Sequence, residues 1–252
     1  MRKPFIAGNW KMNMNHQGAT LLASGLVERL RETDSVDAAV CPPFVYLDAV
    51  AKALSSSNIA LGAQDVYFEN NGAFTGEISC QMLKDLGCTY VIVGHSERRH
   101  VIGETDELIN KKVAAAIRGG LLPIFCVGEL LSEREAGRTN AVVTEQVRKG
   151  LAGIDGEKVL AVTIAYEPVW AIGTGKTATP QQAQEVHVMI RELLARMYNK
   201  GVADELRIQY GGSANPGNTA ALMANADVDG LLVGGASLKA DDFAAMVKTA
   251  VA

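Results

Sequence analysis

Cysteine is scarce in this chain and is not spaced for metal binding. The four cysteines, Cys41, Cys80, Cys88 and Cys126, form no Cys-x-x-Cys pair, so neither a zinc site nor a redox motif is indicated. Cys41 and Cys126 lie in apolar, strand-like runs, where inert buried thiols are expected. We therefore predict no metal centre and a reducing, cytoplasmic location.

A strong charge of one sign and long apolar runs are also lacking. The formal net charge is -4 and 21% of the residues are charged, so the chain has no broad basic surface for nucleic acid. No apolar run reaches transmembrane length, and Met1-Arg2-Lys3 leads into a strand-like segment without a signal-peptide core. We expect no nucleic-acid partner and no membrane partner, and an anionic ligand would need local binding groups.

The usual nucleotide-binding motifs are missing, although one stretch comes close to two of them. Gly175-Lys176-Thr177 resembles the end of a phosphate-binding P-loop, but the glycine required five positions earlier is Trp170. The stretch 173–178 fits a dinucleotide fingerprint, yet such a turn should open directly from a strand, and residues 167–172 intervene. We predict no nucleotide cofactor and no cofactor of another kind.

What the sequence does contain is a regular alternation of strand and helix patterns. Hydrophobic runs predict eight strands, at 5–8, 37–41, 59–63, 90–93, 122–127, 162–164, 207–210 and 230–233. Helical patterns follow at about 17–31, 44–54, 79–86, 104–117, 129–151 with a break at Gly137, 180–198, 216–224 and 236–251. Eight such units favour a single-domain (β/α)₈ TIM barrel over residues 1–252 rather than a doubly wound sheet.

The stretch from Glu167 to Ala178 has the pattern of a catalytic base with a lid. Glu167 follows a buried strand, and Pro168 restricts it to extended conformations, which aims the carboxylate. Glycines let the backbone hinge and approach a ligand, while apolar residues exclude water. The predicted lid comprises Pro168, Val169, Trp170, Ala171, Ile172, Gly173, Thr174, Gly175, Lys176, Thr177 and Ala178. From this stretch alone, an ordinary strand-end glutamate on a surface loop is the alternative.

In a barrel of parallel strands, the residues that follow each strand meet at one rim. Here they are Asn9 and Lys11 after the first strand, His95, Ser96 and Glu97 after the fourth, Glu167 after the sixth, Gly211, Gly212 and Ser213 after the seventh, and Gly234 and Gly235 after the eighth. We expect these residues to share one site.

This rim resembles that of the triosephosphate isomerase family, and the resemblance covers essentially the whole chain. It rests on the segments Gly8-Asn9-Trp10-Lys11, Val93-Gly94-His95-Ser96-Glu97-Arg98-Arg99, 166–176, Tyr210-Gly211-Gly212-Ser213 and Val233-Gly234-Gly235-Ala236-Ser237. The resemblance implies interconversion of dihydroxyacetone phosphate and glyceraldehyde 3-phosphate through an enediolate.

The chemistry of that reaction fits these residue types. Removing a proton next to a carbonyl needs a base and a group that stabilises the developing oxyanion. Glu167 is the expected base, since enclosure under an apolar lid raises the basicity of a carboxylate. His95 leads into a short helical turn whose dipole disfavours imidazolium, so we expect a neutral imidazole that donates to substrate oxygens. His16, His100 and His187 lack a matched acid, and we interpret them as surface or interhelix residues.

Other rim residues receive supporting roles. Lys11 provides a positive charge near the oxyanion and the phosphate, and Asn9 can donate to the same oxygen; a surface amine is the alternative for Lys11. The resemblance places Glu97 beside Lys11 as an orienting or relaying group, and Ser96 beside Glu167. The family resemblance thus implies six catalytic residues at this rim.

The phosphate is expected on backbone N–H groups at the glycine-rich loops. The groups belong to Gly173, Ser213, Gly234 and Gly235, and the last two are predicted to open the final helix, where the dipole favours an anion. Asn9 and Lys11 complete the substrate-binding set. The resemblance also implies that Tyr210 bonds the closed lid near Ala178.

The connection 64–77 is long, has no periodicity and carries aromatic residues. Exposure of its Val66, Tyr67, Phe68 and Phe74 would be unfavourable in water, so we expect a partner to cover it. The resemblance implies a homodimer with Met14, Phe74 and Thr75 at the interface, Thr75 lying near Lys11 of the other chain. A self-packed surface loop is the alternative.

Two other functions share parts of this pattern. Another phosphosugar barrel enzyme would keep the phosphate loops after strands seven and eight but would lack the set Asn9, Lys11, His95 and Glu167. A non-catalytic phosphate-binding barrel would keep the glycines and would need no aimed carboxylate.

Overall fold

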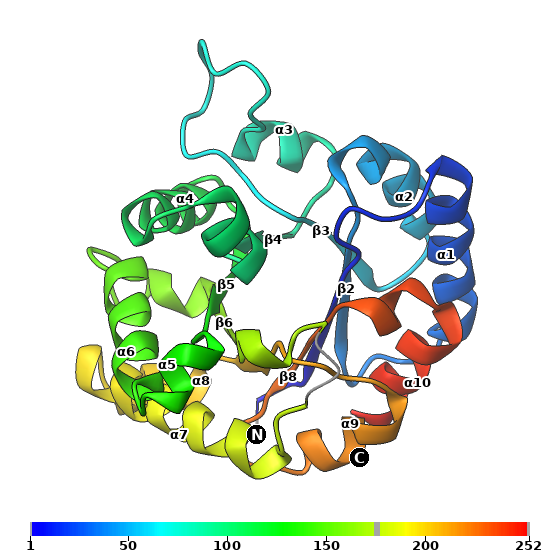
Figure 1. The fold of residues 1–252 in the computed structure, drawn as a ribbon. Helices are drawn as coiled ribbons and strands as arrows, with labels where there is room; N and C mark the ends of the chain where they lie inside the picture. Colours follow the sequence, from blue (N-terminus) through cyan, green and yellow to red (C-terminus); the bar gives the residue numbers. More distant parts are fainter. Residues whose placement is uncertain (1, 174–176, 251–252) are drawn as a thin grey trace.

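The computed structural model describes residues 2–173 and 177–250 and shows a closed barrel of eight parallel strands (Figure 1). The strands are β1 (Phe5–Asn9), β2 (Asp37–Cys41), β3 (Ile59–Ala63), β4 (Tyr90–Val93), β5 (Leu122–Val127), β6 (Thr163–Tyr166), β7 (Ile208–Tyr210) and β8 (Gly230–Val233). Each strand pairs with its neighbours in the chain, and β8 closes the barrel against β1. The predicted (β/α)₈ barrel is confirmed.

The strand ends decide where the candidate functional residues lie. β2, β3, β4, β5 and β8 begin and end at the predicted residues. β6 runs two residues further than predicted, because Tyr166 pairs with Val127 of β5 and with Tyr210 of β7. Glu167 is consequently the first residue beyond the barrel wall.

Helices cover the outside of the barrel (Figure 1). In the described residues they are α1 (His16–Arg29), α2 (Leu47–Leu54), α3 (Cys80–Asp85), α4 (Asp106–Arg118), α5 (Leu131–Glu135), α6 (Thr139–Gly150), α7 (Pro180–Met197), α8 (Lys200–Glu205), α9 (Pro216–Met223) and α10 (Ala240–Thr249). The predicted break at Gly137, with φ of 67°, separates α5 from α6. The sequence pattern missed α8, since a six-residue helix containing Gly201 shows no clear period. In the described part of the chain, no helix combines the length and apolar character needed to cross a membrane.

The hydrophobic core has one part inside the barrel and another between strands and helices. The interior part consists of Phe5, Ala7, Ala39, Cys41, Tyr90, Ile92, Ile124, Cys126, Ala165 and Leu232. Alternate strand residues such as Ile6 face the helices instead. Burial raises the pKa of the Cys41 and Cys126 thiols, which are free and fully buried. These are the inert thiols that the sequence predicts.

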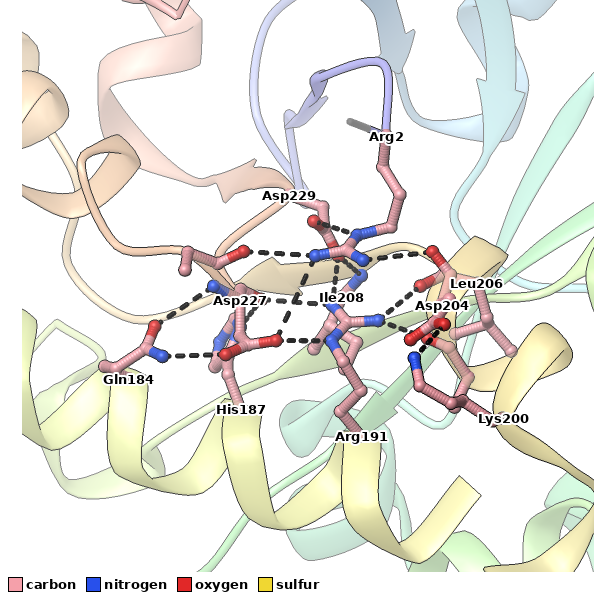
Figure 2. Close-up of polar contacts among 12 residues, drawn as sticks. Arg2, Gln184, His187, Arg191, Lys200, Asp204, Leu206, Ile208, Asp227 and Asp229 are labelled. Carbon is pink, nitrogen blue, oxygen red and sulfur yellow. Dashed lines mark hydrogen bonds and ion pairs between the residues drawn. The ribbon is translucent and has the colours of Figure 1, made fainter. Parts of the chain in front are cut away.

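A partly buried ion network holds the N-terminal ends of the last strands (Figure 2). Arg191 of α7 places Nη2 2.6 Å from Oδ2 of Asp229, just before β8, and Nε 2.5 Å from Oδ1 of Asp227. Arg2 contacts the other oxygen of Asp229, which ties the start of the chain to the same point. His187 is fully buried beside this network, so of the two interpretations given from the sequence, a surface or an interhelix residue, only the surface position is excluded. The network therefore fixes the N-terminal end of the barrel, opposite the end at which Asn9, His95 and Glu167 lie.

Candidate active site

The C-terminal ends of the strands surround one cavity of about 460 Å³. Asn9 ends β1, Lys11 follows it, His95 lies two residues beyond β4 and Glu167 directly follows β6. These side chains line the cavity with Gly173, Gly211, Gly212, Ser213, Gly234 and Gly235. Ser96 and Glu97 are not in the lining but contact residues that are.

His95 and Glu167 are in direct contact. Nε2 of His95 lies 2.9 Å from Oε1 of Glu167, and both side chains are buried. The backbone N–H of Glu97 donates to Nδ1 of His95 at 3.2 Å. Because Nδ1 accepts this hydrogen bond, a neutral His95 carries its proton on Nε2, where it faces the carboxylate.

This contact shifts both pKa values against the expected directions. Burial raises the pKa of Glu167, but His95 and the N–H of Ser96 outweigh it, so the pKa of Glu167 is lowered. Burial lowers the pKa of His95, but Glu167 and Glu97 outweigh it, so the pKa of His95 is raised. The expectation of a more basic Glu167 and a less basic His95 is wrong while the two side chains touch, because their pairing outweighs desolvation.

Backbone groups on several sides fix Glu167. The N–H of Ser96 donates to Oε2 at 2.9 Å, and the N–H of Glu167 itself donates to the carbonyl of Val127 at 2.7 Å. A Cβ at Gly211 would lie 2.8 Å from Cγ of Glu167, so this glycine leaves room for the carboxylate. Ser96 therefore contacts Glu167 through its main chain rather than its hydroxyl.

Lys11 has an unusual backbone conformation that is held by its neighbours. Its φ is 52°, which is uncommon for a residue other than glycine. Its N–H donates to Oδ1 of Asn9 at 3.0 Å, and its carbonyl accepts from Nε2 of Gln64 at 2.8 Å. Its Nζ lies 2.6 Å from Oε1 of Glu97. Gln64 was not singled out from the sequence, since the contact joins two loops far apart in the chain.

The glycine-rich segments after β7 and β8 form the other end of the cavity. Gly235–Leu238 is a 3₁₀ turn and α10 begins only at Ala240. The prediction that the glycine pair opens the final helix is therefore wrong, because an extended Lys239 separates the two. The N–H of Ser213 donates to the carbonyl of Ala171 at 3.2 Å, so a ligand can reach this donor only if that hydrogen bond breaks.

Comparison with known sequences assigns the barrel and its site to a family. The sequence profile described as "Triosephosphate isomerase" matches residues 4–250. The chain belongs to the triosephosphate isomerase family. The triosephosphate isomerase of Carboxydothermus hydrogenoformans is 59% identical over 100% of both chains. Those of Moorella thermoacetica and Rhodopirellula baltica are 56% and 51% identical, and each alignment covers at least 98% of both chains.

In this member of the triosephosphate isomerase family, the sequence pattern missed several cavity residues. Asn13, Asn215, Lys239 and Asp242 also line the cavity. Asn215 had a signal, because an asparagine before Pro216 is a helix cap, and its Oδ1 accepts from the N–H of Gly217. Asn13 lies in the loop after β1, Lys239 is the N-cap of α10 and Asp242 lies in the first turn of that helix, and no local sequence pattern marks these three as cavity residues. No group of three or more His, Cys, Asp or Glu among the described residues is arranged to hold a metal ion.

The structure describes both ends of the lid that is expected in a triosephosphate isomerase, residues 168–173 and residues 177–178. Pro168 is extended, and Val169–Ala171 forms a 3₁₀ turn. Ile172 and Gly173 line the cavity, and Thr177 and Ala178 lead towards α7. Thr174, Gly175 and Lys176 lie outside the described residues. Tyr210 lies beneath, beside the backbone of Ala178, and its burial raises the pKa of its hydroxyl to about 12.

Glu129 joins the base of this lid to the barrel. Its side chain is fully buried and accepts from the Trp170 indole N–H at 2.9 Å and from the Tyr166 hydroxyl at 3.1 Å. Arg134 lies 3.2 Å from the same carboxylate. The sequence pattern predicts that a helix begins at Glu129, but the first helix of this stretch begins at Leu131.

The connection between β3 and α3 projects away from the barrel (Figure 1). Thr75 is exposed and Phe74 is 39% exposed. The Tyr67 ring packs against Phe68 and Phe74, with centroids 4.4 Å and 4.9 Å away. Val66 is buried in the core, so the prediction that it is exposed is wrong. The connection therefore packs partly on itself and still presents an apolar tip.

Proposed function

We propose that this chain interconverts dihydroxyacetone phosphate and glyceraldehyde 3-phosphate through an enediolate. The observation that carries the proposal is the 2.9 Å contact of His95 Nε2 with Glu167 Oε1 inside the lined cavity. A carboxylate and an imidazole N–H that converge in this way can take a proton from a carbon and donate to the neighbouring oxygen. Family membership and relatives named triosephosphate isomerase support the same activity.

The reaction follows from the positions of the side chains. Glu167 removes a proton from the carbon next to the carbonyl, while Nε2–H of His95 donates to the carbonyl oxygen as it becomes negative. Lys11 and Asn9 stabilise that oxygen from the β1 side. The former carbonyl oxygen takes a proton from Nε2 of His95, and the neighbouring substrate hydroxyl gives its proton back to Nε2. Glu167 then returns the carbon-bound proton to the neighbouring carbon, which completes the isomerisation with no net gain or loss of protons. The carboxylate of Glu97 orients the ammonium group of Lys11 through their ion pair.

The phosphate binds at the glycine end of the cavity. Its oxygens accept from the N–H groups of Gly173, Ser213, Gly234 and Gly235, and Lys11 adds a positive charge. Closure of the lid over residues 168–178 breaks the Ser213–Ala171 hydrogen bond, which frees the Ser213 N–H for the phosphate. Tyr210 holds the closed lid from below. These local donors explain how a chain of negative net charge binds a dianion.

The active unit is a homodimer that contains Met14, Phe74 and Thr75 in its interface. Large apolar side chains are exposed in the segments that follow β1, β2 and β4, among them Met12, Val45 and Val101. In the barrel, β2 and β4 flank β3, and β1 flanks β2. The segments that follow these three strands therefore surround the projecting β3–α3 connection. We place the protein in the cytoplasm, with a triose phosphate and a second copy as its partners and with no nucleic acid or membrane partner.

A coupled assay tests the proposal. Purified protein with glyceraldehyde 3-phosphate and no added metal should form dihydroxyacetone phosphate at a rate that depends on Glu167. Absence of turnover above background would overturn the enzyme function. Binding of inorganic phosphate without turnover would instead support the non-catalytic phosphate-binding barrel.

A further inference from the structure

The side chain of Gln146 makes two hydrogen bonds to a single residue at the end of β5. Gln146 lies on α6, and its Oε1 accepts from the Gly128 N–H at 2.7 Å. Its Nε2 donates to the Gly128 carbonyl at 3.1 Å. Gln146 is buried, at 9% exposure. Its loss would leave two backbone groups without partners in a region that water does not reach.

Gly128 lies directly against the main chain of Glu167. A Cβ on Gly128 would be 1.7 Å from the Glu167 carbonyl oxygen and 3.2 Å from its Cα. The residue before it, Val127, accepts the Glu167 N–H at 2.7 Å. The residue after it, Glu129, accepts the Val169 N–H at 3.1 Å through its carbonyl. The segment 127–129 therefore sets the position of Glu167 and of the first turn of the lid.

We infer that Gln146 is a positioning residue for Glu167 and acts through the Gly128 peptide. The inference rests on the proposed function, in which Glu167 is the base. Proton transfer from carbon is sensitive to the placement of the base, and a displacement of about 1 Å can cost a factor of about a hundred in rate. Gln146 does not line the cavity, so its effect reaches the reaction only through Glu167 and the lid base.

The first variant is Gln146→Leu, which keeps similar bulk and removes both hydrogen bonds. We expect kcat to fall about tenfold or more, while KM and inhibition by inorganic phosphate change less than about twofold, because the phosphate donors after β7 and β8 are untouched. The matched control is Asn110→Leu. Asn110 donates to the carbonyls of Gly150 and Ala152, both at 3.0 Å, at the C-terminal end of α6, one turn beyond Gln146 and away from Gly128. This control should lose stability and keep its kcat.

The second variant, Gln146→Glu, tests the hydrogen-bond pattern itself. A protonated carboxyl group can accept from the Gly128 N–H and donate to its carbonyl, whereas the ionised form has no donor. The ratio of variant to parent kcat should therefore rise towards one as pH falls from 8 to 6, since burial raises the pKa of such a carboxyl.

A Gln146→Leu kcat within about twofold of the parent would overturn the positioning role, and so would a pH-independent ratio for Gln146→Glu. If Gln146→Leu does not fold, the pH dependence of the kcat ratio for Gln146→Glu tests the positioning role by itself. An inactive parent protein would contradict the proposed function instead, so the two failures are distinguishable.

Discussion

Nε2 of His95 lies 2.9 Å from Oε1 of Glu167, and this contact keeps the carboxylate weakly basic. Burial raises the pKa of Glu167, and the contact with His95 is the main influence that lowers it. A substrate oxygen that takes the Nε2–H removes that influence, and burial, the largest influence on the pKa, is then opposed only by the Ser96 N–H and Lys11. Substrate binding should therefore make Glu167 a stronger base at the moment when the reaction needs one.

Glu167→Gln should abolish most of the activity. The amide keeps the size of the side chain but cannot accept a proton from carbon, so kcat should fall by at least about a hundredfold. Inhibition by inorganic phosphate should stay unchanged, because the phosphate donors lie elsewhere in the cavity. Glu205→Gln, an exposed change in α8, is the control and should keep full activity. A Glu167→Gln kcat within about threefold of the parent would contradict the assignment.

Tyr210→Phe should let the reaction intermediate escape more often. Loss of the hydroxyl beside Ala178 weakens the closed lid, and an enediolate phosphate that meets water eliminates phosphate to give methylglyoxal. We expect several times more methylglyoxal per isomerisation turnover. Tyr198→Phe, which removes a hydroxyl that bonds Leu151 outside the site, is the matched control. Equal methylglyoxal yields from parent and Tyr210→Phe would show that Tyr210 does not hold the lid.

Charged residues at the tip of the β3–α3 connection and at its expected contact should separate the subunits. We expect the double change Thr75→Glu and Met14→Glu to give monomers in sedimentation and to lower kcat about tenfold or more, since like charges would be buried together. Leu160→Glu, at a partly exposed position before β6 on the opposite face, should stay dimeric and active. A monomeric double variant with full kcat would refute a site completed by the partner chain.

His187 should make the protein less stable in mild acid. Burial lowers its pKa from 6.5 to about 4, against weaker effects of the Asp227 carbonyl and the Asp229 carboxylate. The unfolded chain therefore binds this proton first, and stability is lost as pH falls from about 6.5 to about 4. At about 1.4 kcal/mol per pH unit, the loss reaches about 3 kcal/mol.

Urea titrations between pH 7 and 4 measure this effect. His187→Gln should reduce the slope of unfolding free energy against pH over that window, whereas His16→Gln, an exposed histidine on α1, should leave it as in the parent. An unchanged slope in His187→Gln would show that this histidine is not responsible.

The sequence predicts the barrel well because each strand is a short apolar run that ends at a polar residue, a glycine or, after β2, a proline. The same logic brings Asn9, His95 and Glu167 to one rim before any contact is known. It cannot find Glu129 or Gln146, since their partners lie in other segments and no local pattern records a long-range hydrogen bond. It also misjudges the pKa of Glu167, because burial follows from the sequence pattern while the touching imidazole does not.

The pairing of β1 with β8 means that the barrel can close only after β8 has been synthesised. The ribosome makes Phe5 in the first strand of the barrel, yet its partner Gly230 lies in the last strand. Any sheet that forms before then is open, and the free edge of β1 could pair with a strand of another chain. Arg2 likewise meets Asp229 only after β7 has been made. Chaperones that cover exposed strand edges would therefore act on β1 for longer than on any later strand.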